Sequence, residues 1–421
     1  RNCCACTLAR EELIVLLYSS MKPIYLDWAA SSPMDPELAS TMVELYTHSY
    51  GNPSSSHSFG RTAKKILRKT RERCSFLLQV NPDQLIFTSG GTEANTLPLL
   101  SLLRRSSGGE IVLSAFEHAA VYELGSLFRE KGFQVKEVKP DTNGIIQPEE
   151  VRRQLSPATI AVAVMLVNNE IGSIQPIRRI SQEMRKFETD HSTRIHFHCD
   201  AVQALGKIPV NLMSSGADTM AFSGHKLCAP KGIGLLYSKN KFTPLAFGGG
   251  QEFGIRPGTE NIPAVWAFGE ALEKRYSHME AEYAHAIKLR DRLFLQIEEI
   301  EGAEVFPQDR PRADMLGSGK WSELNYSPYI VAINISPVPG EICARVLNDR
   351  GIAVATGSAC SSSRKKQRGR VAYSITADEQ IAQGIIRVSF GPGNSEPDID
   401  SFAHTLQQEL QLLRKTVRHS R

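Results

Sequence analysis

Lys226 is the residue of this sequence whose setting best suits covalent chemistry. Residues 219–222 predict a short buried strand, and Ser223-Gly224 then interrupts it. The interruption places His225 and Lys226 at the carboxyl end of the strand, which is where open α/β sheets bind ligands. Burial there would lower the pKa of the amine and free it to form a Schiff base with a carbonyl compound. The alternative is an ordinary surface lysine in a turn.

An acidic residue follows a second predicted strand. Ile195 and Phe197 lead to Asp200, and a carboxylate at the same sheet edge could pair with a protonated pyridine nitrogen. Gln203, one helical turn further on, could donate to a phenolic oxygen of the same ring. The stretch from His196 to Asp200 also has the residue types of a zinc site, but the sequence offers no second ligand pair at finger or enzyme spacing. The sequence therefore predicts no metal.

Two further groups follow the ends of predicted strands. Gly91 and Thr92 come after the apolar stretch 85–89 and open a helix, so the free backbone amides and the Thr92 hydroxyl would form an anion cradle. His118 follows the strand predicted at 110–116, where its imidazole could stack on a planar ring and move protons. For a single histidine in this position, a purely structural role is the alternative.

A cysteine set among small residues is a candidate mobile thiol. Cys360 lies within the run from Ala355 to Ser363, whereas a buried cysteine normally packs among large apolar side chains. A basic run from Arg364 to Arg370 follows, and nearby cations would favour the thiolate. The same run could be a nuclear-localisation or nucleic-acid patch, but it lacks interleaved aromatic residues, and most charge runs are solvated loops.

The elements that must position these groups are predicted from the periodicity of apolar residues. Strands alternate with helical patterns from residue 36 to 280, which predicts a large α/β domain with a mostly parallel sheet flanked by helices. The stretch 160–167 is continuously apolar, as expected of a strand covered on both faces, and it leads to Asn169. A single long helix is predicted from Pro263 to Ile300.

A smaller α+β domain is predicted from the remainder of the chain. Residues 21–35 together with 281–421 form it, and they include a strand at 329–335, a helix at 340–349 and the cysteine loop. Residues 301–330 are irregular and have no assigned role.

The composition is that of an ordinary globular protein of 421 residues, with 41% apolar and 22% charged residues. A net charge of +4 is too small to indicate nucleic-acid binding. The eight cysteines show no regular spacing, which favours a reducing compartment and predicts a cytoplasmic protein. Residues 1–20 contain no apolar run long enough to span a bilayer. They are interpreted as an extension that is disordered or not native, with Met21 as the expected start.

These motifs resemble those of the pyridoxal-phosphate enzymes of the aspartate-aminotransferase fold, over the range from about Ile24 to Ala403. Within that fold, Ser223-Gly-His-Lys226, Pro230-Lys-Gly-Ile-Gly234 and Gly357-Ser-Ala-Cys-Ser361 are similar to motifs of the cysteine desulfurases of the NifS and IscS type. The resemblance implies pyridoxal 5′-phosphate as the cofactor. It also implies conversion of L-cysteine to L-alanine, with the sulfur held on Cys360 as a persulfide.

The resemblance assigns roles to individual residues. The implied catalytic residues are Lys226, Cys360 and His118, and the implied contacts to the substrate carboxylate are Asn169 and Arg387. The implied cofactor-binding set is Gly91, Thr92, His118, Asn169, Asp200, Gln203, Ser223, His225, Lys226 and Thr259.

The resemblance also implies partners. Thr259 is expected to reach the cofactor phosphate of a second subunit, which implies a homodimer. A protein sulfur acceptor, such as an iron–sulfur scaffold or a protein of tRNA thiolation, is expected, and neither a nucleic acid nor a membrane is. Selenocysteine lyase is the alternative that shares the lysine and the aspartate. An aminotransferase would need no mobile cysteine, and a non-catalytic relative is disfavoured because no cofactor-contacting position of the motifs is lost.

Overall fold

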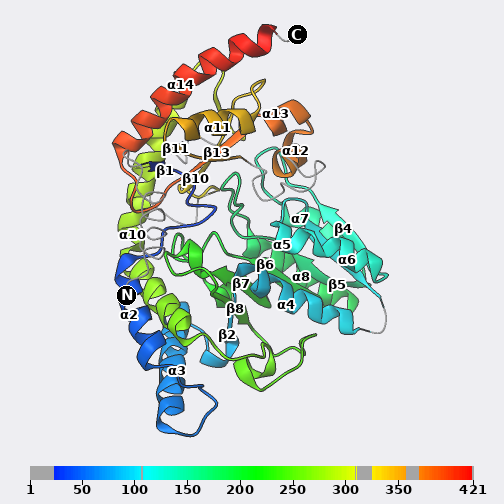
Figure 1. Ribbon diagram of the computed structural model, residues 1–421. Helices are drawn as coiled ribbons and strands as arrows, with labels where there is room; N and C mark the ends of the chain where they lie inside the picture. The colour runs from blue at the N-terminus through cyan, green and yellow to red at the C-terminus, as the bar shows by residue number, and fades with distance from the viewer. Residues whose placement is uncertain (1–22, 106–107, 309, 311–324, 357–368, 420–421) are drawn as a thin grey trace, which may run out of the picture.

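A seven-stranded sheet forms the centre of the protein (Figure 1). The computed structural model describes residues 23–105, 108–308, 310, 325–356 and 369–419. The spatial order of the strands is β2-β8-β7-β6-β5-β3-β4; β8 runs antiparallel to both of its neighbours, and the other neighbouring pairs are parallel. The strands are β2 (Leu85–Thr88), β3 (Glu110–Ser114), β4 (Gln134–Val138), β5 (Thr159–Ala163), β6 (His196–Asp200), β7 (Thr219–Ser223) and β8 (Gly234–Ser238).

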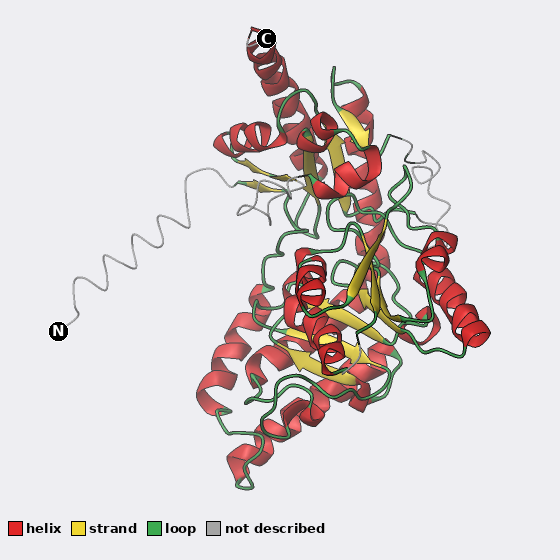
Figure 2. Ribbon diagram, turned by 90° about the vertical axis from the view of Figure 1, so that its right-hand side faces the viewer, coloured by secondary structure: helices red, strands yellow, loops and turns green. Residues whose placement is uncertain are grey.

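Helices pack on both sides of this sheet, as Figure 2 shows. Asp35 caps the first of them, because its carboxylate accepts from the Glu37 amide at 3.0 Å and Pro36 occupies the first helical position. The helices are α2 (Pro36–His48), α3 (Ser58–Leu78), α4 (Gly91–Ser101), α5 (Ala119–Tyr122), α6 (Leu124–Glu130), α7 (Pro148–Gln154), α8 (Ile177–His191) and α9 (Leu212–Ser215).

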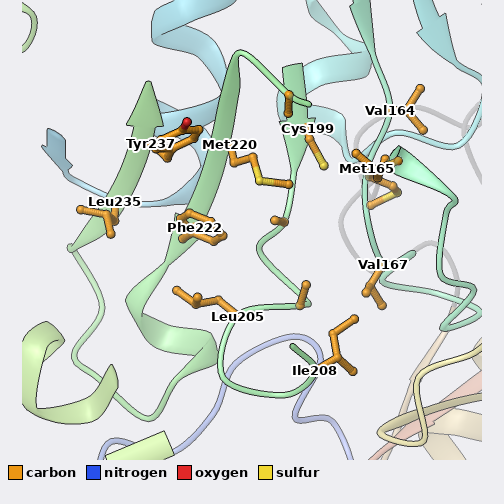
Figure 3. Close-up of a cluster of buried hydrophobic side chains, with 14 of the residues drawn as sticks. Val164, Met165, Val167, Cys199, Leu205, Ile208, Met220, Phe222, Leu235 and Tyr237 are labelled. Carbon is orange, nitrogen blue, oxygen red and sulfur yellow. The ribbon is translucent and has the colours of Figure 1, made fainter. Parts of the chain in front are cut away.

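Side chains along β6 and β7 alternate between the two faces of the sheet. Cys199 on β6 and Met220 and Phe222 on β7 lie in one apolar layer with residues of β8 and of the segment that follows β5 (Figure 3). Side chains one residue away along each strand point to the opposite face. All five residues of β7 are buried, so both faces of this strand are covered, as predicted for a mostly parallel sheet.

A smaller mixed assembly completes the fold. Its antiparallel sheet has the order β12-β13-β10-β9, and β1 pairs in parallel with β11 beside it. These strands are β1 (Ile24–Tyr25), β9 (Glu304–Phe306), β10 (Ile330–Asn334), β11 (Ile352–Ala353), β12 (Ala355–Thr356) and β13 (Ile385–Ser389). The helices with them are α11 (Gly340–Asp349), α12 (Arg370–Thr376), α13 (Glu379–Gln383) and α14 (Glu396–His419). The predicted fold class, a large mostly parallel α/β unit with a smaller α+β unit, is confirmed.

One long helix joins the two parts. Helix α10 (Ile262–Glu298) packs against α2 and α3 of the large part and against α14 of the small one. The predicted helix from Pro263 to Ile300 is therefore confirmed. The predicted boundary at residue 280 falls inside this helix, and the assignment of 36–280 and of 21–35 with 281–421 to two domains stays a prediction.

The largest local difference from the predicted elements concerns the apolar stretch 160–167. The strand β5 itself ends at Ala163, although the Val164 and Leu166 amides still donate to the His198 and Asp200 carbonyls of β6. Val164, Met165 and Val167 nevertheless stay buried. Burial alone produces an apolar run, so such a run overestimates the length of a strand. Within the residues described, no helix has the length and apolar character needed to cross a bilayer.

Candidate active site

Lys226 lies at the carboxyl end of β7 and is 9% exposed. Gly224 allows the tight turn after the strand, since a Cβ there would lie 2.6 Å from the Ile233 side chain. The Lys226 ammonium donates to the carbonyl oxygens of Ala29 and Ala30, which come from the segment after β1. The structure thus places a buried lysine at the ligand edge of the sheet, and the surface-lysine alternative is wrong.

Asp200 ends the neighbouring strand β6 and is 4% exposed. Its Oδ2 accepts from the Asn95 amide at 2.7 Å, and its Oδ1 accepts from the Val202 N–H at 2.9 Å. The pKa of Asp200 is raised overall, because burial has the largest effect. The charge of His118, these hydrogen bonds and the charge of Lys226 act in the opposite direction. Each carboxylate oxygen can accept a further hydrogen bond. Asp200 is therefore a buried acceptor within electrostatic reach of the lysine.

Helix α4 begins against the same two strand ends. A Cβ on Gly91 would lie 2.9 Å from Val202 and 3.2 Å from Ser223, so the first turn of the helix packs directly on the loops after β6 and β7. Ser223 is buried, and Thr92 is exposed at the start of α4. Free amides at the start of this 11-residue helix favour an anion. The predicted cradle residues are thus gathered around one helix terminus.

His118 precedes α5 and is half-buried. Its Nδ1 accepts from the Ala120 N–H at 3.1 Å, so the neutral ring carries its proton on Nε2. Burial lowers the pKa of His118, with Asp200 acting against this shift and Lys226 with it. The imidazole is therefore neutral at neutral pH. It can accept a proton on Nδ1 only if the hydrogen bond from the Ala120 N–H is released.

Arg370, the first residue of α12, secures the backbone on either side of this histidine. Its guanidinium donates to the carbonyl oxygens of Ala115 and Glu117 and stacks over the Tyr122 ring at 3.8 Å. This last member of the predicted basic run is therefore a structural anchor, and the solvated-loop reading is wrong for it. Arg364, Lys365, Lys366 and Cys360 lie outside the described residues.

Gln203 donates its side-chain amide to the Ala29 carbonyl at 2.8 Å. The Lys207 ammonium donates to the other end of the amide, Oε1, at 2.9 Å. This contact fixes the orientation of the amide, so the NH₂ group of Gln203 is the end that faces Ala29, which also accepts from Lys226. Lys207 is 4% exposed, and burial lowers its pKa well below the ordinary lysine value. Sequence reasoning did not single out Lys207.

Arg387 of β13 is buried where the small sheet meets the large one. Its Nη2 donates to Asp27 at 2.6 Å and its Nη1 to the Asn169 carbonyl at 2.8 Å. Among the residues described, no hydrogen-bond acceptor faces its Nε. The structure thus brings Arg387 and Asn169 together, as expected. It also gives Arg387 an ion pair with Asp27 that the sequence did not reveal.

His225 directly precedes Lys226 in the turn after β7, and Thr259 lies on the loop before α10. The Nδ1 of His225 is 3.3 Å from the Ser31 hydroxyl, and burial, reinforced by the Lys226 charge, lowers the pKa of His225 to about 4. Thr259 is exposed, on a loop that Arg256 joins to Glu93 of α4 at 3.1 Å. The predicted contact of Thr259 with a second subunit stays a prediction.

The histidines of β6 do not behave as metal ligands. His198 is fully buried, with Nδ1 2.9 Å from the Thr219 hydroxyl and Nε2 2.8 Å from the Asn95 side-chain oxygen. Both ring nitrogens are therefore engaged. Over the described ranges, no cluster of three histidine, cysteine or acidic side chains is placed to hold a metal ion.

Two acids near the site were also not foreseen: Glu117, which is buried, and Glu170, which is half-buried. Burial raises the pKa of Glu117 to about 8 and that of Glu170 to about 7. Glu117 accepts from the Ser114 hydroxyl and from the Met165 N–H, the latter at 2.7 Å. The Glu117 carboxyl therefore remains mostly protonated at neutral pH and that of Glu170 about half protonated, which limits the negative charge around Asp200.

The sheet order, the buried lysine after β7 and the aspartate at the end of β6 define an α/β protein of the aspartate-aminotransferase-like fold class. The family model for aminotransferase class-V matches residues 24–402. The chain belongs to this family.

Three of the proteins that are similar to this chain show how far the likeness extends. A cysteine desulfurase IscS of Dictyoglomus turgidum is 32% identical over 397 residues, covering 93% of this chain and 96% of that protein. A mitochondrial cysteine desulfurase of Saccharomyces cerevisiae is 34% identical over 406 residues, covering 94% and 76%. The solved structure of a NifS-like protein has a TM-score of 0.82 and 30% identity, covering 93% of this chain and all of that one.

Proposed function

We propose that this protein is a pyridoxal-phosphate-dependent cysteine desulfurase that converts L-cysteine to L-alanine and holds the sulfur on Cys360 as a persulfide. The observation that carries the proposal is the placement of buried Lys226 beside Asp200, with the start of α4 packed against both strand ends. Similarity to proteins named cysteine desulfurase over more than nine-tenths of the chain supports it.

The residues present fit pyridoxal phosphate. The start of α4 offers amides to the phosphate, and Asp200 is a buried acceptor for the ring nitrogen. Gln203, with its amide oriented by Lys207, offers a donor to the phenolic oxygen. His118 is the expected stacking partner of the ring. We assign Thr92, Ser223, His225, Asn169 and, from a second subunit, Thr259 to the same binding set.

The side chains divide the work of the reaction. When bound, the cofactor supplies an electron sink for the carbon atoms of the substrate. Lys226 provides the covalent attachment point, and Lys226 or His118 moves the α-proton. The Cys360 thiolate attacks the substrate sulfur: an S–S bond forms, the C–S bond breaks, and its electron pair stays with the substrate carbon, which is then protonated to give alanine. A reductant or an acceptor thiol later removes the persulfide sulfur.

Arg387 is proposed to hold the substrate carboxylate, since a guanidinium can bind a carboxylate through two parallel hydrogen bonds. It is buried and keeps Nε without an acceptor among the described residues. Asn169, whose carbonyl accepts from Arg387, is proposed to lie at the same end of the substrate site.

Replacement of Arg387 by lysine tests this assignment. An ammonium cannot reproduce the fork, so the KM for L-cysteine is expected to rise about tenfold or more, with a smaller decrease in kcat. Steady-state alanine production measures both constants. Arg292→Lys is the matched control, because Arg292 makes a two-bond contact with Asp400 on the surface between α10 and α14. A lower kcat with an unchanged KM would remove Arg387 from substrate binding.

The direct test of the function is incubation with L-cysteine and a thiol reductant, with alanine and sulfide quantified together. Equal amounts of the two products are expected. Turnover that depends on an added keto acid would instead identify an aminotransferase, and activity on selenocysteine alone would identify a selenocysteine lyase. A purified protein without the visible absorbance of lysine-bound cofactor would support a non-catalytic relative.

The partners of this enzyme are proposed from the same resemblance. We expect a homodimer and a protein sulfur acceptor, such as an iron–sulfur scaffold or a protein of tRNA thiolation, with neither nucleic acid nor membrane involved. Cytoplasmic localisation remains the prediction from the irregular spacing of the cysteines.

Charge reversal at Arg364, Lys365 and Lys366 tests whether the basic run after Cys360 docks an acidic acceptor. Sulfur transfer to the acceptor protein is expected to slow about tenfold at low salt, and less at high salt, because screening weakens the attraction. Alanine formation with a small reductant should change little. Charge reversal at Lys64, Lys65 and Lys69 of α3, all exposed, is the control. Equal loss of both rates would mean that the three cations serve the chemistry or the fold.

A further inference from the structure

A set of buried polar side chains lies behind Asp200. On β6, residues 196, 198 and 200 share one face, because side chains two residues apart point the same way. His198 pairs in register with Thr219 of β7, and α4 covers both strands. His198, Thr219 and Asn95 of α4 are each no more than 1% exposed. Polar groups at such depth are costly unless each has a partner.

The donors and acceptors in this set can be ordered from the Asp200 end. Asn95 must use its NH₂ group on Asp200 at 2.7 Å, so its oxygen accepts from Nε2–H of His198 at 2.8 Å. His198 is neutral, since burial lowers its pKa to about 3, so its Nδ1 must accept from the Thr219 hydroxyl at 2.9 Å. The Thr219 oxygen then accepts from Nε2–H of His196, also at 2.9 Å.

We propose that Thr219, His198 and Asn95 are positioning residues that form a one-directional hydrogen-bond chain holding Asp200 ionised and correctly aimed for the cofactor ring nitrogen. The proposal rests on the proposed function for the identity of the ligand. This hydrogen-bond chain gives His196 and His198 of β6 a role. Neither a metal site nor a direct contact with the cofactor accounts for them.

The direction of the chain is what gives it this effect. Every donor points toward Asp200, so the bond dipoles align and each bond polarises the next. The chain therefore stabilises the carboxylate against the burial that would otherwise favour its protonated form. His198 also fixes which end of the Asn95 amide meets Asp200. Without that contact the amide could turn over and present an oxygen to the carboxylate.

Two amide substitutions at His198 separate the two ends of the ring. Glutamine places an amide nitrogen near the position of Nε2 and retains a donor to Asn95, whereas asparagine ends near Nδ1 and leaves Asn95 without one. Binding of pyridoxal phosphate to the cofactor-free protein is expected to be near the wild-type Kd in His198→Gln and about tenfold or more weaker in His198→Asn. With ¹⁵N-labelled pyridoxal phosphate, the ring-nitrogen signal should move toward the neutral pyridine value only in His198→Asn.

Thr70→Val on α3 is a control for removal of a buried polar group, because Thr70 is 4% exposed and packs against Gly269 of α10. It should leave both the Kd and the ¹⁵N signal unchanged. Equal Kd values and ring signals in the two His198 variants, with both folded, would overturn the proposal while leaving the proposed function intact.

A second readout needs no cofactor. In the cofactor-free protein labelled with ¹⁵N-histidine, the His198 ring, identified by its absence in His198→Gln, is expected as the neutral Nε2–H tautomer at neutral pH. An Nδ1–H tautomer or a charged ring would overturn the direction of the chain. Failure of the wild type to bind pyridoxal phosphate, with the expected tautomer present, would overturn the proposed function and the assigned ligand together.

Discussion

Replacement of Lys226 by alanine is expected to abolish turnover of L-cysteine and the visible absorbance of lysine-bound cofactor. The decrease in kcat should be at least about ten-thousandfold, because the substitution removes the covalent attachment point and a proton-transfer group, and acid–base catalysis alone contributes about 10²–10⁴. Lys231→Ala, at an exposed lysine five positions further along the same loop, should retain normal activity and absorbance.

Reduction with borohydride followed by peptide mapping locates the attachment point. The label is expected on the peptide that contains Lys226. The result has diagnostic value because Lys207 is a second buried lysine, bound to Gln203, and burial lowers the pKa of Lys207. A label on Lys207 would contradict the assignment of Lys226 and leave the cofactor in the same pocket.

Replacement of Cys360 by alanine is expected to reduce desulfuration of L-cysteine by about a thousandfold or more, since loss of a covalent nucleophile leaves only binding and electrostatic effects. Cleavage of selenocysteine should fall much less. A carbon–selenium bond is weaker, and a selenol is ionised at neutral pH, so selenium can leave without a thiolate attacking it. The wild type is expected to accept both amino acids, as measured by steady-state alanine production.

Cys228→Ser is the matched control for loss of a thiol, because Cys228 is half-buried and lies two residues beyond Lys226. It should desulfurate cysteine at close to the wild-type rate. A Cys360→Ala enzyme that still desulfurates cysteine at that rate would remove Cys360 from the mechanism. A wild type active only on selenocysteine would change the assignment to the lyase.

The part of the site that could be predicted from sequence lies at strand ends. Lys226, Asp200 and Gly91 each follow a short apolar stretch, and parallel strands bring their carboxyl ends to one edge, so local pattern was enough. Gln203 was expected one helical turn after Asp200, but residues 202–207 form turns instead of a helix. The turn still delivers the side chain to the lysine, because both contact the Ala29 carbonyl.

The contacts missed from sequence join residues that are far apart in the chain. Asp27 meets Arg387, and Asn95 meets both His198 and Asp200. No periodicity encodes such pairs, because each depends on how helices and strands pack. The one available signal was the spacing of His196, His198 and Asp200 on a single face of a strand. That spacing indicated a shared environment but not whether a metal or other side chains would occupy it.

The segment after β1 has a consequence for the biosynthesis of this protein. It emerges from the ribosome before any strand of the large sheet, yet β1 pairs with β11, and the Ala29 amide donates to the Ser389 hydroxyl, 360 residues later (Figure 1). The seven-stranded sheet needs only residues up to 238 and can assemble during translation. The Ala29 carbonyl accepts from Lys226 and Gln203, and the Ala29 amide is held by Ser389 of β13, so we expect this carbonyl to reach its final position only after β13 has been made. We therefore expect the proposed cofactor to enter a complete site only after translation, and a nascent chain halted before β13 to have an incomplete site.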